Sequence, residues 1–264
     1  MRNLFFVLLT FLMVGSVFAG EIKRVTGIGS CAIVNMTAEQ ARMIALQRAR
    51  ADAIENASGV KVSVNTVVTK GELTLDLIKT YSSGYIIDEK VFWLPLGEYR
   101  PSKYAAPIPE YRVKIEASVM VSKKIVDVGL QAKLNKHTFI KGDKAYINIQ
   151  TQKDANIAIF NLMANDRVIM LYPNAYEKAH ELKAGEKFVF PGKNAVYDLE
   201  MSTLPGHPSD TEAFLVVATD NKKIDFRKLF KLDSDVSLID FYKKYSKIAE
   251  SVQEVILPYQ VFEK

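Results

Sequence analysis

The residues that could do chemistry are few and scattered. The chain has three histidines and one cysteine, and its most suggestive stretch is His180-Glu181-Leu182-Lys183-Ala184. A zinc protease of the His-Glu-x-x-His type needs a second histidine four residues after the first, because both imidazoles then leave one helical face toward the metal. Position 184 is an alanine. The stretch therefore predicts a polar loop and no metal site.

Other reactive arrangements are missing from the sequence. It holds neither a Gly-x-Ser-x-Gly elbow nor a Walker loop, and Gly27-Ile28-Gly29 lacks the later glycine of a dinucleotide-binding turn. Cys31 lies in an apolar run, which favours a buried, inert thiol over a reactive one. Solvated turn residues explain Asp88-Glu89, and a helix cap explains Asp233-Ser234-Asp235 better than a calcium site.

We therefore expect a protein that is not an enzyme and binds no metal or other cofactor. A hydrolase whose site is assembled in space, around His180 or His207, is the least favoured alternative. It requires a serine or a carboxylate beside one of these imidazoles in a pocket.

The first residues have the composition of an export signal. Arg2 precedes an apolar run from Leu4 to Val14, and small residues fit a cleavage between Ala19 and Gly20. The run is short for a membrane span, and no later stretch is long enough. We expect a signal peptide over residues 1–19 and no transmembrane segment after its removal. The alternative is an uncleaved anchor.

Composition places the chain among ordinary globular proteins. Hydrophobic residues make up 48% and charged residues 25% of its 264 residues. The formal net charge of +5 is not concentrated enough for nucleic-acid binding, so we expect no nucleic-acid partner. A single cysteine excludes an intrachain disulfide. With the export signal, this composition predicts a periplasmic or outer-membrane-associated protein.

Residues 20–124 predict an α+β domain built on one long helix. The helix should run from Ala38 to about Ala57, because Thr37 and Gln40 form a capping box before it and Gly59 tolerates the left-handed conformation that ends helices. Its alanines recur every fourth position, at Ala41, Ala45, Ala49, Ala53 and Ala57. Small side chains along one face let this helix lie close against a sheet.

The strands of this domain flank the helix in the sequence. Arg24–Val34 predicts a strand with a bend or bulge at its two glycines. Further strands are expected at Val60–Val64, Tyr85–Leu94 and Tyr111–Val121, with a short helix at Glu72–Tyr81. This order predicts a helix packed on one face of a mainly antiparallel sheet.

A loop rich in proline and tyrosine is expected between the last two strands, over residues 95–109. Tyr99, Arg100, Tyr104 and Tyr111 lie in or beside it. Exposed aromatic and arginine side chains are typical of protein contact surfaces, so these four are candidate partner-contact residues. The alternative is an ordinary long connection.

Three runs in this region carry a family resemblance: GIGSCAIVNMTAEQARMIALQRARADAIENASGVKVSV, SSGYIIDEKVF and YRVKIEASVMV. Together they resemble the N-terminal domain of the bacterial flagellar assembly protein T and the related domains of LPP-type outer-membrane lipoproteins. The resemblance implies a structural role at the envelope and brings no catalytic residues with it.

Residues 125–264 predict a β-sandwich-like domain, because short strands follow one another at close spacing. A hairpin turns at Asn165-Asp166, and a late amphipathic helix begins after Ser237 with Leu238, Phe241, Tyr242, Tyr245, Ile248 and Ala249 on one face. The expected strands are Val126–Asn135, Lys144–Thr151, Asn156–Met163, Arg167–Tyr172, Glu186–Phe190, Val196–Met201, Ala213–Ala218 and Val255–Phe262.

This region is similar to a bacterial domain of unknown function whose hairpin ends in Leu-(Tyr/Phe)-Pro-Asn. The residues that match its signature are Leu171, Tyr172, Pro173, Asn174, Gly185 and Pro191. The chain departs from the family at Pro205-Gly206-His207-Pro208-Ser209, so the loop before the late strand is expected to differ.

Taken together, the residues predict a non-enzymatic exported protein with a structural, assembly or protein-interaction role, whose partner is an envelope protein. The alternative is a periplasmic module that binds a small ligand or peptidoglycan, with the Tyr172-Pro173-Asn174 corner as its site.

Overall fold

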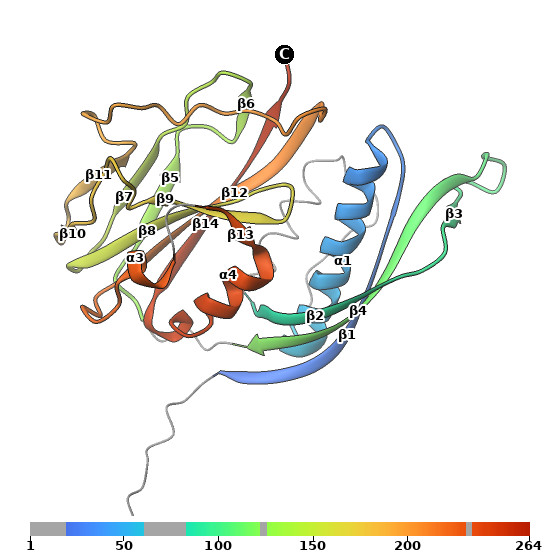
Figure 1. Ribbon diagram of the computed structural model, residues 1–264, viewed down its shortest axis with the longest axis horizontal. Helices are drawn as coiled ribbons and strands as arrows, with labels where there is room; N and C mark the ends of the chain where they lie inside the picture. Colours follow the sequence, from blue (N-terminus) through green and yellow to red (C-terminus); the bar gives the residue numbers. More distant parts are fainter. Residues whose placement is uncertain (1–19, 61–82, 122–125, 231–233) are drawn as a thin grey trace, which may run out of the picture.

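The computed structural model describes residues 20–60, 83–121, 126–230 and 234–264. Within them the chain is an α+β protein, with a helix on a sheet followed by a sandwich-like region and a late helix, as the sequence predicts (Figure 1). The expected signal segment, the helix at Glu72–Tyr81, all but the first residue of the strand at Val60–Val64, and the domain boundary at 124–125 lie outside the described residues.

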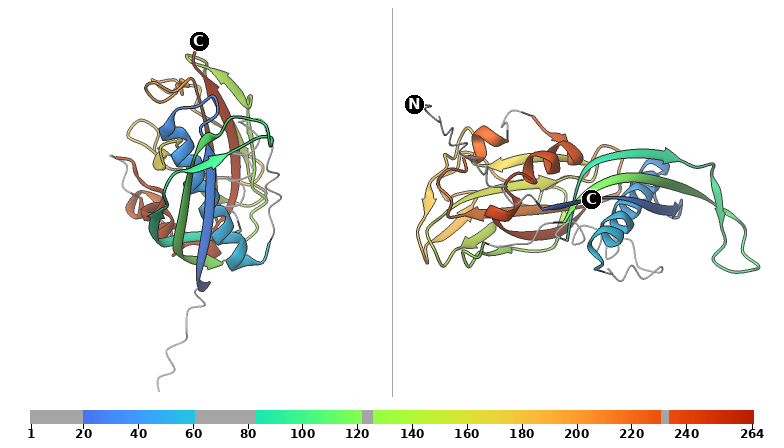
Figure 2. Two further views of the ribbon diagram at one scale, coloured as in Figure 1. Left: turned by 90° about the vertical axis from the view of Figure 1, so that its right-hand side faces the viewer. Right: turned by 90° about the horizontal axis from the view of Figure 1, so that it is seen from below.

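The N-terminal sheet is antiparallel and has the order β1-β4-β2, with β3 paired to β4. Its strands are β1 (Glu21–Ala32), β2 (Tyr85–Trp93), β3 (Gly97–Tyr99) and β4 (Ile108–Val121). The helix α1 (Ala38–Ser58) lies across one face of this sheet, which leaves the opposite face open over much of its length (Figures 1 and 2).

The ends of α1 form as the sequence predicts. Thr37 Oγ1 accepts a hydrogen bond from the Gln40 amide at 3.1 Å, and Gln40 Oε1 accepts one from the Thr37 amide at 3.0 Å. Gly59 takes a left-handed φ of 73° and donates its amide to Glu55. Both ends of the helix therefore have partners for backbone groups that helices otherwise leave unpaired.

The two glycines of β1 do not form a β-bulge, which was one of the two alternatives that the sequence predicted. Pairing with β4 runs without a register shift from Glu21↔Val121 to Ala32↔Glu110. Instead, both glycines face α1: a Cβ at Gly27 would lie 2.0 Å from the Ala49 carbonyl oxygen, and one at Gly29 would lie 2.1 Å from that of Ala45. The glycines let the helix backbone approach the sheet, opposite the alanine stripe.

The C-terminal region consists of two sheets that enclose a core. The larger sheet has the order β13-β9-β8-β12-β14-β6, with β10 on β8, and the smaller has the order β11-β7-β5. Buried side chains from both sheets form one hydrophobic cluster between them. The strands are β5 (Gln131–Leu134), β6 (Thr138–Ile140), β7 (Ile147–Gln150), β8 (Ala155–Leu162), β9 (Arg167–Tyr172), β10 (Glu181–Leu182), β11 (Lys187–Phe190), β12 (Ser209–Thr219), β13 (Val236–Ser237) and β14 (Gln253–Phe262).

Several boundaries differ from those expected. Val126–Asn135 is a strand only over β5, and Val196–Met201 is not a strand: only Glu200 pairs, in an isolated bridge with Lys144. The stretch around His180 is not wholly a loop, since Glu181–Leu182 pairs with β8. The short β6 pairs in parallel with β14, a contact between distant segments that no local pattern indicates.

The late helix buries the first part of its predicted apolar stripe but ends at Tyr245, so Ile248 and Ala249 lie beyond it. Ser237 caps α4 (Leu238–Tyr245) through a hydrogen bond from the Asp240 amide, and the helix buries Phe241, Tyr242 and Tyr245. A one-turn helix, α3 (Phe226–Leu229), and the 3-10 helix η1 (Ala249–Ser251) lie near it in the sequence. Phe160 of β8 contacts the Phe241 ring at 5.0 Å, so α4 covers the face of the larger sheet away from the smaller one.

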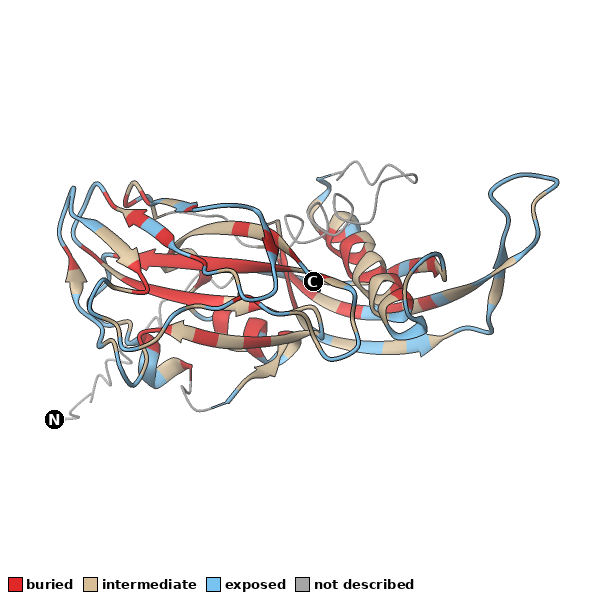
Figure 3. Cartoon of the chain, turned by 90° about the horizontal axis from the view of Figure 1, so that it is seen from above, coloured by how far each residue is buried: buried red, intermediate tan, exposed pale blue. Residues whose placement is uncertain are grey.

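The two regions share one hydrophobic core. Residues of α1, the N-terminal sheet, α4 and the larger C-terminal sheet belong to the same buried cluster. Figure 3 shows in red where buried residues lie along the chain. Tyr85 of β2 contacts the rings of Tyr242 and Tyr245 at 5.4 and 5.2 Å.

An ion cluster joins the same regions. Arg50 of α1 is only 2% exposed. Its guanidinium donates to Glu89 of β2 at 2.6 and 2.9 Å, and to both carboxylate oxygens of Asp166 in the β8–β9 turn. We call these three residues the Arg50 clamp.

Candidate functional site

A β-hairpin projects from the N-terminal sheet past α1, and we call residues 94–110 the arm (Figures 1 and 3). It forms because β3 pairs with the start of β4, Gly97 with Glu110 and Tyr99 with Ile108. Tyr104 near its tip is 93% exposed, and Leu94, Leu96 and Tyr99 are exposed as well. The arm therefore presents apolar and aromatic side chains to solvent, far from the core.

The four candidate contact residues separate in the structure. Tyr99, Arg100 and Tyr104 lie on the arm, where Arg100 pairs with Glu98 at 3.3 Å. Tyr111 instead lies in β4, partly buried, with its ring 6.2 Å from that of Trp93. Three of the four are thus available for contact, and the fourth helps to hold the base of the arm.

Sequence reasoning missed the apolar residues that lead into the arm. Phe92 at the end of β2 is exposed, and so are Leu94 and Leu96 beyond it. Their neighbours Val91 and Trp93 face α1 on the opposite side of the strand. The signal was present, because the end of β2 is apolar at every position, and only one side of a strand can face the helix.

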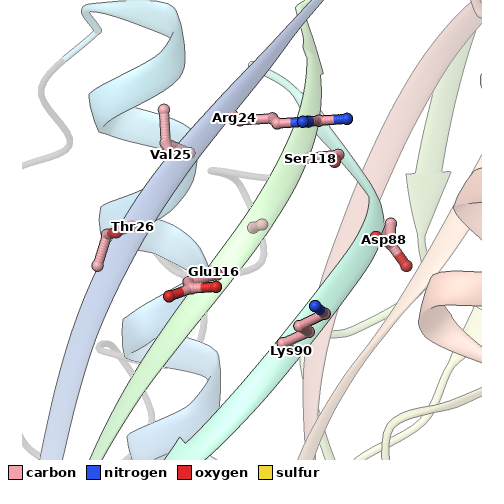
Figure 4. A pocket seen from close by; sticks show the side chains of 8 residues that line it. Arg24, Val25, Thr26, Asp88, Lys90, Glu116 and Ser118 are labelled. Carbon is pink, nitrogen blue, oxygen red and sulfur yellow. The ribbon is translucent and has the colours of Figure 1, made fainter.

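A second feature lies on the open face of the N-terminal sheet. It is a shallow depression of about 500 Å³, which we call the hollow (Figure 4). Its lining comes from three strands: Arg24, Val25 and Thr26 of β1, Asp88 and Lys90 of β2, and Glu116, Ala117 and Ser118 of β4. Cations, anions and hydroxyls therefore face the same space.

The hollow corrects one prediction. Asp88 and Glu89 are not turn residues, because both lie inside β2, on opposite faces. Asp88 faces the hollow, and Glu89 faces α1, where it pairs with Arg50. Alternation along a strand separates two carboxylates that are adjacent in sequence, so they cannot act as a catalytic pair.

The second acidic pair of the sequence is Asp233 and Asp235, and the structure describes only Asp235. Asp235 receives hydrogen bonds from Arg167 at 3.1 Å, and these bonds lower the pKa of its carboxyl group. It is not a helix cap, since Ser237 has that role for α4. Asp233 lies outside the described residues.

The family-signature residues other than Gly185 lie around one corner of the sandwich. Asn174 organises it: its Nδ2 donates to the Leu171 carbonyl at 2.8 Å and to the Tyr197 hydroxyl at 2.7 Å, and its Oδ1 accepts from the Tyr176 and Glu177 amides. The peptide bonds Tyr172-Pro173 and Phe190-Pro191 are both cis. These contacts show that the signature builds a tight corner of the fold.

Burial decides what this corner can contact. Tyr172 is 1% exposed, and its hydroxyl donates to the Lys178 carbonyl and lies 3.1 Å from His180 Nδ1. Burial raises the pKa of Tyr172. Gly185 lies in a separate tight turn with a φ of 79°. The exposed ring of the corner is Tyr176, which packs against Tyr197 at 5.6 Å and is not part of the predicted site.

The three histidines lie in separate places, but two of them lie near a carboxylate. His207, in the loop before β12, lies 2.7 Å from Asp210 of that strand, and His180 Nε2 lies 3.7 Å from Glu186. His180 Nδ1 also lies 3.1 Å from the Tyr172 hydroxyl, and His137 Nδ1 lies 3.0 Å from the Pro258 carbonyl. Cys31 is buried, and its burial raises the pKa of the thiol, as expected of an unreactive cysteine. Across the described ranges, no group of three or more His, Cys, Asp or Glu side chains is placed to hold a metal ion.

A buried carboxylate in the larger sheet accepts hydrogen bonds at both of its oxygens. Glu212 of β12 accepts from the Tyr259 hydroxyl at 2.6 Å, the Asn161 side chain at 2.9 Å and the Ala164 amide at 3.1 Å. Burial raises the pKa of Glu212. Since these donors belong to the surrounding strands and turn, the cluster serves the fold.

Comparison with known families covers part of the C-terminal region. Residues 138–222 match the sequence profile of a family described as Domain of unknown function (DUF4384). The match contains the whole family signature, from Leu171 to Pro191. No profile of the flagellar assembly protein T or LPP type matches the N-terminal region.

Comparison with curated proteins finds no match to the chain. None of the helices in the described residues combines the length and apolar character needed to cross a bilayer. The chain is therefore similar, between β6 and the end of β12, to a domain family whose function is unknown.

Proposed function

We propose that this chain is a non-enzymatic, exported envelope protein that acts by binding another envelope protein through the arm. The observation that carries the proposal is the placement of Leu94, Leu96, Tyr99 and Tyr104 on a projecting hairpin, in solvent. Exposed aromatic and apolar side chains on a protruding element are what a partner buries at the centre of an interface.

Two further observations support this role. The first residues, Met1 to Ala19, have the composition of an export signal, and the N-terminal runs resemble the flagellar assembly protein T and LPP-type domains, whose role is structural. The polar clusters inside the described part of the fold, namely the Arg50 clamp, the Glu212 cluster and the Asn174 corner, serve to hold elements together.

Affinity capture from envelope extracts tests this proposal. The mature chain should retain a defined partner, and the double variant Leu96→Ser/Tyr104→Ser should lose at least tenfold of that retention, because these side chains would anchor the interface. A matched control is Tyr176→Ser, which removes a tyrosine of the other region that is also largely exposed, at 71%. Equal capture by all three proteins would refute a contact role for the arm.

A second candidate function is a module for a small ligand or for peptidoglycan. The observation that favours it is the exposed Tyr176 ring beside Tyr197, since an exposed aromatic face can stack on a sugar ring. The site then lies next to the predicted Tyr172-Pro173-Asn174 corner, whose first two residues are buried. Muropeptides should raise the unfolding midpoint of the mature chain and leave that of Tyr176→Ala unchanged; no shift with either protein excludes this site.

A further inference from the structure

The charges of the hollow form a regular pattern set by the strand register. One row crosses the sheet as Arg24, Ser118 and Asp88, and the next as Thr26, Glu116 and Lys90. The two cations therefore lie at opposite corners of this patch. Glu116 lies on the middle strand beside Lys90, and Asp88 lies at a third corner, opposite Arg24 across β4. Within the described residues, Arg24, Asp88 and Lys90 make no ion pair, and Glu116 has only a long contact of 3.9 Å with Lys114.

The spacing of this pattern follows from sheet geometry. Neighbouring strands lie about 4.8 Å apart, so the backbones of Arg24 and Asp88 are roughly 10 Å apart on the two sides of β4. Figure 4 shows Arg24 reaching from β1 across β4 toward Ser118, with Asp88 on the far strand. The hollow thus presents a cation from β1 and an anion from β2, both within the reach of a very short peptide.

The mixture of charges excludes most ligand classes. A metal ion would be repelled by Arg24 and Lys90, and a phosphate or nucleic acid by Asp88 and Glu116. An apolar ligand would remove charged side chains from water without replacing their partners. A ligand that carries both a carboxylate and an ammonium group satisfies the two signs at once.

We propose that the hollow binds a short zwitterionic peptide. Its carboxylate pairs with the Arg24 guanidinium, which suits the planar fork of that side chain, and its ammonium group lies between Asp88 and Glu116. The hydroxyls of Thr26 and Ser118 supply neutral hydrogen-bond partners between the charges. The volume of about 500 Å³ falls within the usual range for small-ligand sites.

Two neighbouring features frame the site. Tyr85 and Met120, one row toward the C-terminal region, belong to the core that includes α4, so that end of the face is closed. In the row on the other side, Ile28 and Phe92 are exposed and flank Lys114. They offer apolar contact to a peptide side chain that extends out of the hollow. All the lining residues lie on paired strands, which hold them rigidly.

Trialanine is a suitable probe, since three extended residues span roughly 10 Å and carry one charge at each end. We expect it to shift the backbone amide resonances of β1, β2 and β4 around the hollow in the mature chain, with a Kd of about 0.1–1 mM, because exposed ion pairs contribute modestly. Acetylating the amino end or amidating the carboxyl end should each weaken binding about threefold, the effect of losing one exposed ion pair.

The variant Arg24→Met assigns the orientation. It should weaken binding of free trialanine about threefold and leave the binding of the C-terminal amide unchanged, because both changes remove the same ion pair. Lys187→Met on β11 is the matched control and should bind like the wild type. Equal binding of free and capped peptides, shifts outside the hollow, or no effect of Arg24→Met would each overturn the proposal.

Two sources could supply such a peptide, a free pool or the stem peptides of the cell wall. Arg24-dependent retention on intact peptidoglycan would identify the wall, whereas binding of free peptides alone would identify the soluble pool. Peptide binding in the hollow is independent of partner binding through the arm. Arg24→Met should leave partner capture intact, so the experiments can reject one of the two proposals without rejecting the other.

Discussion

The larger C-terminal sheet and the N-terminal sheet differ in how their two faces are covered. In the larger C-terminal sheet, β12 is buried at almost every position, because the smaller sheet covers one face and α4 covers the other. In the N-terminal sheet, successive side chains of β1 and β2 alternate between more buried and more exposed, because α1 covers one face and solvent the other. The difference indicates that the C-terminal sheet is the scaffold and that the open N-terminal face, with its arm, is the surface free to meet other molecules.

The largest predicted difference in stability between the buried and the exposed parts of the molecule is at the Arg50 clamp. Arg50→Met should lower the free energy of unfolding by about 4 kcal/mol, because it leaves the carboxylates of Glu89 and Asp166 without their cation at a largely buried site. Chemical denaturation of the mature chain measures the change. Arg100→Met, at an exposed pair on the arm, should stay within about 0.5 kcal/mol. Similar losses in both variants would remove the distinction between scaffold and surface.

The next largest change in the free energy of unfolding is expected at the contact between β1 and α1. Gly27→Ala should cost about 3 kcal/mol, because the added Cβ would meet the backbone of α1, which cannot rotate away as a side chain would. Ile28→Ala, at the neighbouring exposed position on the open face, should cost less than about 1 kcal/mol. The same denaturation measurement tests the pair, and a tolerated Gly27→Ala would show that α1 does not lie this close.

A pH dependence should distinguish the buried scaffold from the exposed face. Because burial raises the pKa of Glu212, the folded state binds the proton of this carboxyl group more tightly than the unfolded state does. Its contribution to stability is therefore fully present below the ordinary carboxyl pKa and is lost as pH rises through the raised value.

Unfolding of the wild type and of Glu212→Gln, followed from pH 4 to pH 8, isolates this group. The stability of the wild type relative to the variant should fall with rising pH, by on the order of 1 kcal/mol. A relative stability that rises with pH would show that the hydrogen bonds of Tyr259 and Asn161 outweigh burial.

The smallest effects on stability are expected on the arm. Leu96→Ser and Tyr104→Ser should each change the free energy of unfolding by less than about 0.5 kcal/mol, since both side chains are exposed. Thermal unfolding monitored by circular dichroism is sufficient to detect a larger loss. A loss of stability well above this value in either variant would mean that the arm packs as part of the core.

The sequence predicts the parts of the fold that rest on local patterns. The capping box at Thr37, the terminating Gly59, the alanine stripe and the aromatic face of α4 are all confirmed, because each depends on residues within a few positions of one another. Contacts between distant segments escape such reasoning: Arg50 meets a turn residue 116 positions away, and β6 pairs with the end of the chain.

The candidate sites divide in the same way. The sequence could place Tyr99, Arg100 and Tyr104 in an exposed loop because a turn-rich segment between strands is local information. The hollow instead depends on which side chains three strands bring into line. The Asn174 corner combines both kinds of information. Its motif was recognised, but its residues turn inward and hold the fold together.

The most direct test of the partner-binding role is site-specific photo-crosslinking in living cells. A photoreactive residue at position 104 should give one dominant protein adduct, and the same residue at position 176, also exposed, should not give that adduct. The adduct should disappear when Leu96→Ser is added to the arm while the protein stays folded. Identical adduct patterns from the two positions, or none from position 104, would contradict the assignment of the arm as the contact element.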